Sequence, residues 1–355
     1  MKKLGYAFLS LLVLIGCNKP PEQTDFDRGA MLTNMSTSII DPAYSALGAS
    51  LGHLKADANA FVQSASITTL NQLKSTFNQT YLDFEACKMF NFGAIEDYAI
   101  VTAMNTYPTD TTKIASNISS GTYTLGALEN FQAIGLPAID YLLFHADELE
   151  IISEFTIDLE ANNRKSYLID LCNKMDEEFD LALSGWENSK LDFAAADGND
   201  VGSSTSLLFN AFVKDIELVK NAKIGIPAGF QTAGEILPHY IETYFSEQSI
   251  TLAVANLTAL QNLFNGKDGL GFDDYIRDVE DNSVENSLAD QINAQFELCI
   301  SKINAIESPL SEKVNSDHAT VTEAYNEVKT LVTYVKTDMS SILGLLITFQ
   351  DNDGD

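Results

Sequence analysis

Apolar residues recur at intervals of three and four along most of this chain. One series contains Ile292, Phe296, Cys299, Ile303 and Ile306, and similar series cover residues 70–84, 168–179 and 321–342. This spacing places apolar side chains on one stripe of an α-helix, and the stripe must be buried against another helix. No stretch shows a convincing alternation with a period of two. The sequence therefore predicts an all-α fold built from helical bundles.

The longest polar interruption near the middle runs from Trp186 to Ser204, with glycines at positions 198 and 202. Domain boundaries fall in polar, glycine-containing segments that few contacts cross. We therefore expect two helical-bundle domains packed against each other, an N-terminal one over residues 26–185 and a C-terminal one over residues 186–355.

Three shorter breaks carry further expectations. Pro42 should kink or split the first long helix, because proline lacks the N–H that a helix interior uses. Residues 105–121 are rich in Thr and Ser and predict an irregular loop. Asn265-Gly266 is typical of a helix end.

The first 17 residues are typical of a bacterial lipoprotein signal. Lys2 and Lys3 precede an apolar run over residues 4–16, which ends in Gly16-Cys17. Such a run is too short to span a bilayer and suits a signal sequence. We expect cleavage before Cys17 and lipidation of its thiol; the alternative is an ordinary secretory signal with a chance cysteine.

Residues 18–25 contain two prolines and predict a flexible tether. No later apolar run approaches membrane length, so the lipid alone should hold the protein to the cell envelope. Residue 18 is Asn rather than the Asp of a simple inner-membrane retention cue, which favours the outer membrane. The membrane is therefore the first expected partner.

Acidic residues dominate the charge, with 50 Asp and Glu against 21 Lys and Arg. A nucleic-acid backbone would be repelled, so nucleic acid is not expected as a partner. A cation is a natural partner, although an acidic surface also simply keeps an exported protein soluble. Besides Cys17 the chain has Cys87, Cys172 and Cys299. An odd number leaves at least one thiol unpaired, and the last two lie among apolar positions, as buried thiols do.

Five segments in order resemble one family. They are FNQTYLDFEACKMFNFGA at residues 77–94, GLPAIDYLL at residues 135–143, a long block at residues 195–229, ETYFSEQS at residues 242–249 and a C-terminal Asp-Gly-Asp. Together they are similar to the imelysin-like family, also called peptidase M75. The resemblance covers nearly the whole chain that follows the signal. It implies two facing helical bundles with a site between them, and a role in iron or other metal uptake in the envelope.

The family signature Gly-x-His-x-x-Glu has changed in this chain to Gly135-Leu-Pro137-Ala-Ile-Asp140. Proline offers no ligand atom, whereas Asp140 keeps a carboxylate. A buried carboxylate needs a partner, so we expect a cation, a hydroxyl such as that of Ser246, or backbone N–H groups beside it. The resemblance implies an interface site formed by Asp140, Pro137, Glu85, Glu242 and Ser246. Asp140 and Glu242 are its expected metal ligands, and a divalent or ferric cation its expected cofactor.

Other polar patterns in the chain are weaker candidates for a site. His145-x-x-Glu148 and His239-x-x-Glu242 could each chelate a metal if they lay on one helix face, but the pattern is weak. Lysines 214, 220 and 223 alternate with Asp215 and Glu217, which predicts a salt-bridged, exposed helix face.

A binding function is favoured over catalysis. A zinc peptidase of the common kind needs two histidines four residues apart together with a glutamate, and the signature supplies no such set. No nucleophile elbow, Walker loop or dinucleotide fingerprint is present, so no catalytic residue is assigned. The sequence thus predicts a binding lipoprotein for metal acquisition, with a metal ion or an envelope uptake protein as partner. A peptidase or a module that binds a peptide or protein is the alternative.

Overall fold

The computed structural model describes residues 26–280 and 284–349. Cys17, the signal, the tether and the acidic C-terminal end lie outside these residues. All regular secondary structure in the described residues is helical, which confirms the predicted all-α class. No helix among the described residues has both the length and the apolar character needed to cross a bilayer.

The N-terminal group of helices is formed by two long helices, α2 and α3, the longest helix, α9, and several short ones. They are α1 (Arg28–Met35), η1 (Ser36–Ile40), α2 (Asp41–Gln63), α3 (Ile67–Cys87), α4 (Ala94–Asp97), α5 (Ile100–Met104), α6 (Thr111–Ser120), η2 (Leu128–Asn130), α7 (Gly135–Phe144), α8 (Glu148–Glu154) and α9 (Ala161–Ala195).

The C-terminal group contains the other predicted stripes. Its elements are α10 (Ser204–Leu218), η3 (Val219–Gly225), η4 (Pro238–Tyr240), α11 (Ser249–Phe264), α12 (Phe272–Val279), α13 (Leu288–Asn304), α14 (Leu310–Ser316), α15 (His318–Thr333), η5 (Tyr334–Met339) and α16 (Ser340–Leu343). As expected, Asn265 ends α11, and Gly266 follows it with a positive φ of 63°.

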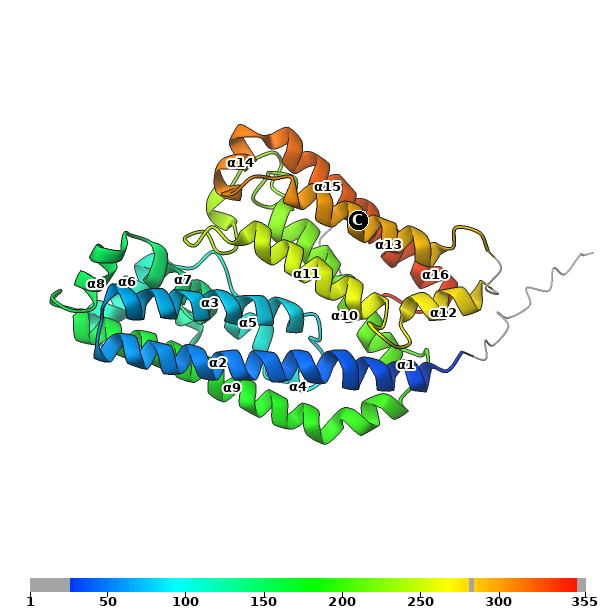
Figure 1. The fold of residues 1–355 in the computed structure, drawn as a ribbon, viewed down its shortest axis with the longest axis horizontal. Coiled ribbons are helices and arrows are strands. Elements are labelled where there is room, and N and C mark those ends of the chain that lie inside the picture. Colours follow the sequence, from blue (N-terminus) through cyan, green and yellow to red (C-terminus); the bar gives the residue numbers. More distant parts are fainter. Residues whose placement is uncertain (1–25, 281–283, 350–355) are drawn as a thin grey trace, which may run out of the picture.

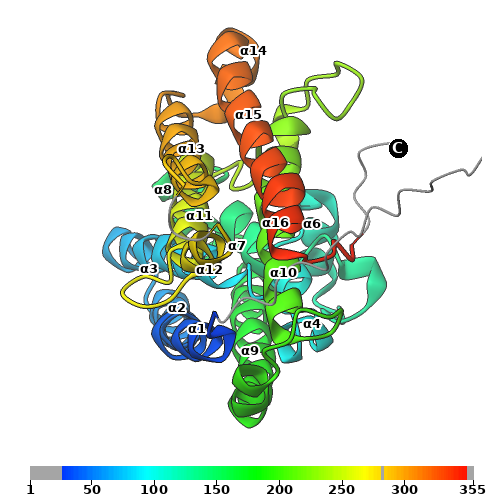
Figure 2. The same cartoon turned by 90° about the vertical axis from the view of Figure 1, so that its right-hand side faces the viewer.

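Figures 1 and 2 show the two groups as two layers of helices, with α2, α3 and α9 in one and α11, α13 and α15 in the other. Helix α3 packs against α11 where the layers meet. The buried apolar side chains form one continuous core across both groups. The separation into two domains at the predicted boundary therefore stays a prediction.

Helix α9 is longer than the sequence suggested. It continues through Trp186 to Ala195, so the polar interruption covers only residues 196–203. The indole of Trp186 packs edge-on against Tyr44, and its N–H donates to Asp41 at 2.7 Å. Phe193 stacks on Phe92. These contacts bury one face of the last turns of α9, while the polar residues between them face solvent.

Two other interruptions differ in detail from expectation. The break at Pro42 takes the form of the π-helical segment η1, which immediately precedes α2. The predicted loop over residues 105–121 is wrong in its second half, which forms α6. The Asp110 side chain caps this helix by accepting from the N–H of Lys113, and Ile114 and Ile118 bury its inner face.

The three thiols at Cys87, Cys172 and Cys299 are free and buried. Burial in apolar surroundings disfavours the thiolate and raises the pKa of Cys172 and Cys299 to about 12. These residues act as small apolar side chains of the core.

Candidate functional site

Helix α7 places Asp140 at the junction of the two groups of helices. The helix begins at Gly135, as the sequence predicts, with Pro137 in its first turn. Gly135 has a φ of 74°, and a Cβ atom there would lie 2.4 Å from the carbonyl oxygen of Met104. Only glycine allows this close approach. Pro137 and Asp140 are both buried, and only 1% of the surface of Asp140 is exposed to solvent.

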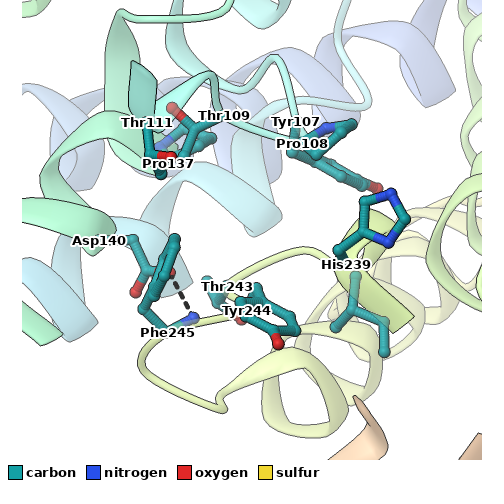
Figure 3. A pocket seen from close by; sticks show the side chains of 11 residues that line it. Tyr107, Pro108, Thr109, Thr111, Pro137, Asp140, His239, Thr243, Tyr244 and Phe245 are labelled. Atoms are coloured by element: carbon teal, nitrogen blue, oxygen red, sulfur yellow. Dashed lines mark hydrogen bonds between the residues drawn. The ribbon is translucent and has the colours of Figure 1, made fainter. Parts of the chain in front are cut away.

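The carboxylate of Asp140 holds the loop that precedes α11. Its two oxygens accept hydrogen bonds from the backbone N–H groups of Phe245 and Ser246, at 3.0 and 3.1 Å, and Figure 3 shows the first of these bonds. The structure therefore brings together Asp140 and Ser246. Burial raises the pKa of Asp140 to about 6, although hydrogen bonds from Ser246 and Phe245 act in the opposite direction.

A cavity of about 250 Å³ opens beside Asp140, and we call it the Asp140 cavity. The segment between α5 and α6, together with α7, forms one wall, and the segment that follows η4 forms the other. Its lining residues are Tyr107, Pro108, Thr109, Thr111, Pro137, Asp140, His239, Ile241, Thr243, Tyr244 and Phe245. Asp140 and Phe245 lie at one end, and Tyr107 and His239 lie at the other (Figure 3).

Glu85 and Glu242 lie in a second cluster deeper between the layers. Lys223 bridges them: its Nζ lies 3.0 Å from Glu85 Oε1 and forms a close ion pair with Glu242. Asn105 also donates to Glu242 Oε1 at 2.6 Å. Thus the structure brings Glu85 and Glu242 together, but through a lysine that the sequence analysis did not assign to the site.

Lys88 and Asp215 extend this cluster. Lys88 Nζ lies 3.2 Å from Asp215 Oδ1 and 3.5 Å from Glu85 Oε2. Asn256 of α11 donates to Asp215 Oδ2 at 2.6 Å. We call Glu85, Lys88, Asp215, Lys223 and Glu242 the buried charge network, because every member is at most 6% exposed.

The sequence predicts that the charged residues between positions 214 and 223 lie on an exposed helix face. This prediction is wrong for four of these five residues. Asp215, Glu217, Lys220 and Lys223 are buried, and only Lys214 is exposed. The cause is visible in the sequence of α10, where apolar residues surround the charged ones on nearly all sides. A helix that is apolar all round is buried, and this pattern is the signal that the charges lie inside.

The network carries more negative than positive groups, three carboxylates against two ammonium groups. Burial and the neighbouring Glu242 raise the pKa of Glu85 to about 8, against the opposing effect of both lysines. Burial also opposes ionisation of Glu242, but Lys223 and Lys88 outweigh it and lower the pKa of Glu242. Glu85 is therefore the carboxylate of the network whose ionised form is least favoured.

A model of the imelysin family matches residues 40–335. This chain belongs to the imelysin family. Its fold is similar to an iron-regulated protein A precursor from Parabacteroides distasonis, at 15% identity and a TM-score of 0.74, over 89% of this chain and 95% of that one. It is also similar to an imelysin-like protein from Psychrobacter arcticum, at 18% identity and a TM-score of 0.74, over 92% of this chain and 99% of that chain. No curated protein matches the chain.

The two His-x-x-Glu strings of this imelysin-family chain have other roles. His145 contacts the carbonyl oxygen of Tyr141 and the carboxylate of Glu154 at 3.2 Å, so its acidic partner is Glu154 and not Glu148. His239 lies in the short 3₁₀ turn η4, which is followed by extended backbone. His239 lines the Asp140 cavity, while Glu242 pairs with Lys223, so they do not share a helix face.

Among residues 26–280 and 284–349, no three His, Cys, Asp or Glu side chains are grouped closely enough to hold a metal ion together. Asp140 accepts two backbone hydrogen bonds, and Glu242 is paired with Lys223 and Asn105. Metal binding by these two residues stays a prediction. The geometry offers two features instead, a cavity with a buried carboxylate and a charge network that joins the two layers.

Proposed function

We propose that this imelysin-family chain is an envelope binding protein for iron acquisition, anchored by lipid at Cys17, with its cargo held in the Asp140 cavity. The observation that carries the proposal is the buried carboxylate of Asp140 beside a cavity between the two helical layers. Two backbone N–H groups accompany this carboxylate, but no cationic side chain among the described residues pairs with its charge, which favours a cation in this cavity.

The donors around the cavity suit a hard cation. Asp140 offers carboxylate oxygen, Tyr107 and Tyr244 offer phenolic oxygen, and His239 offers an imidazole. Oxygen donors of this kind favour ferric iron over soft metals. One structural relative is named as an iron-regulated protein, which agrees with this assignment at the level of the family fold.

The form of the cargo follows from the spacing of these donors. Asp140 and His239 lie at opposite ends of the cavity, and the described residues provide no group of three His, Cys, Asp or Glu ligands. A bare ion would therefore have few protein ligands. We infer that iron enters as a complex with a small chelator, which fills both ends of the cavity and supplies the remaining ligands.

A peptidase is the alternative, and the local chemistry supports it less well. Pro137 stands where the resemblance to the family leads us to expect a histidine, and no His-Glu-x-x-His set exists in the sequence. The two oxygens of Asp140 are used as acceptors for backbone N–H groups. A group used in this way orients a loop and is poorly placed as a general base.

Calorimetric titration with two iron probes tests the proposal. Ferrous sulfate under anaerobic conditions represents the bare ion, and ferric acetohydroxamate represents a chelate without carboxylates. We expect the chelate to bind more tightly than the ion. Both His239→Ala, at an exposed residue, and Asp140→Asn should weaken binding by about tenfold or more.

The matched control is Asp180→Asn, which makes the same chemical change on the exposed side of α9. It should leave iron binding unchanged. Equal affinity of the wild type, His239→Ala and Asp140→Asn for the chelate would overturn the proposal. So would zinc-dependent peptide hydrolysis by the purified chain, which would support the peptidase alternative.

A further inference from the structure

A second cavity, of about 330 Å³, shares Tyr107 with the Asp140 cavity. It lies between α5, the end of α3 and the segment formed by α10 and η3. Three lysines line it, Lys88, Lys214 and Lys223, and no Asp or Glu is among its lining residues. We call it the lysine cavity. This composition is unexpected in a chain with 50 acidic and 21 basic residues.

Two of the lysines are fixed in place. The side chains of Lys88 and Lys223 are only 5% and 3% exposed. Their carboxylate partners in the buried charge network do not line the cavity, so the lysines stand between these acids and the cavity. The ion pairs therefore hold the ammonium groups of Lys88 and Lys223 in position at the cavity wall before any ligand binds.

The charged side chains that face the cavity are all positive, because three lysines and no Asp or Glu line it. Burial and Glu242 raise the pKa of Glu85, so the ionised form of the surplus carboxylate behind the lysines is disfavoured. Lys214 is exposed at the cavity and adds one positive charge. An anion in the cavity would thus meet an uncompensated ammonium group and the positive ends of two ion pairs.

The rest of the wall combines polar and apolar groups. Asn91, Thr102 and Tyr240 offer neutral hydrogen-bonding groups, while Leu218 and Ile226 offer apolar surface. The volume lies at the lower end of the range for small-molecule sites. An inorganic ion would leave the apolar wall and much of the volume unfilled, so an organic molecule fits better.

We propose that the lysine cavity binds a small organic anion with one or more carboxylate groups. Binding here is independent of what the Asp140 cavity holds, because the two cavities share only Tyr107 among their lining residues. The proposal therefore adds a second ligand site to this chain and stands whether or not iron binds at Asp140.

Calorimetry and thermal melting with citrate as the probe test this proposal. We expect citrate to bind and to raise the melting temperature, and we expect added salt to weaken the binding. Inorganic phosphate should bind more weakly, and glycerol should not bind. Lys214→Gln should weaken citrate binding about fivefold, the effect expected for one partly exposed ion pair.

Two further variants locate the anion. Ala222→Leu adds bulk to the cavity wall without a change in charge, and it should weaken binding more than Lys214→Gln. Lys329→Gln makes the same chemical change as Lys214→Gln on the exposed face of α15 and should leave binding unchanged. Asp140→Asn should also keep citrate binding, which separates this site from the iron site.

Several outcomes would overturn the proposal. These are no citrate binding by the folded wild type, equal affinity of the wild type, Lys214→Gln and Ala222→Leu, or phosphate binding as tight as citrate binding. Loss of citrate binding in Asp140→Asn alone would place the anion in the other cavity and would also contradict it.

Discussion

At the scale of single residues, the buried charge network makes opposite predictions for its acids and its bases. Glu85 is the surplus carboxylate, so Glu85→Gln should change stability little at pH 7 or increase it. Lys223→Met would leave Glu242 without its ammonium partner and should cost about 3–5 kcal/mol of unfolding free energy. Urea denaturation at pH 7 measures both. A larger loss for Glu85→Gln than for Lys223→Met would contradict this description of the network.

The same residue predicts a pH dependence. Glu85 has an ordinary pKa near 4.5, which burial and Glu242 raise to about 8 in the folded protein. Between these values the folded state holds a proton that the unfolded state has released, so this group stabilises the fold at low pH. The contribution should fall as the pH rises from about 4.5 to 8 and then level off. Glu85→Gln should remove that fall, which denaturation curves at pH 5, 7 and 9 would reveal.

At this scale the acidic members of the two clusters are predictable from the sequence, and the lysines between them are not. Asp140 and Ser246 were expected together and lie together, and Glu85 and Glu242 share one cluster. Lys223 was placed on an exposed face, because neighbouring opposite charges along one helix usually pair in solvent. The apolar residues around these charges indicate that they are buried, but they do not indicate that Glu85 of α3 and Glu242 are the partners of Lys223.

At the scale of elements, the start of α7 depends on one glycine. Gly135→Ala would place a methyl group against the carbonyl of Met104 in a left-handed conformation, and it should cost about 2–4 kcal/mol. Gly52→Ala is the matched control, because Gly52 lies exposed within α2 with open space around it. That change should stabilise the fold by about 0.5–1 kcal/mol. Equal thermal stability of the two variants would show that α7 tolerates a different start.

The helices themselves were the most predictable part of the fold. Apolar stripes are a local property, and three of the four long stripes lie within a helix or a continuous helical stretch, while the fourth continues past the end of α13 to Ile306. Helix α6 was missed because its Thr- and Ser-rich sequence resembles a loop, and its capping by Asp110 and two buried isoleucines outweigh that composition. The last turns of α9 were missed because their exposed face is polar, while Trp186 and Phe193 anchor the other face.

At the scale of the whole molecule, the predicted lipid anchor decides where the protein resides. Cys17→Ser should leave the signal uncut or release the protein into the soluble fraction, because serine cannot form the thioether to the lipid. Membrane fractionation and the mass of the processed chain measure this outcome. Normal processing and membrane association of Cys17→Ser would contradict the anchor.

The charge network also constrains how the chain reaches its fold. Glu85 and Lys88 are made early, whereas Asp215, Lys223 and Glu242 follow more than a hundred residues later. If the N-terminal helices closed on their own, the face of α3 that carries Glu85 and Lys88 would lack α11 and its charged partners. Water would then solvate these groups until the rest of the chain arrived. We therefore expect the exclusion of water from this junction to be a late step of folding, with the two layers becoming native together and not one after the other.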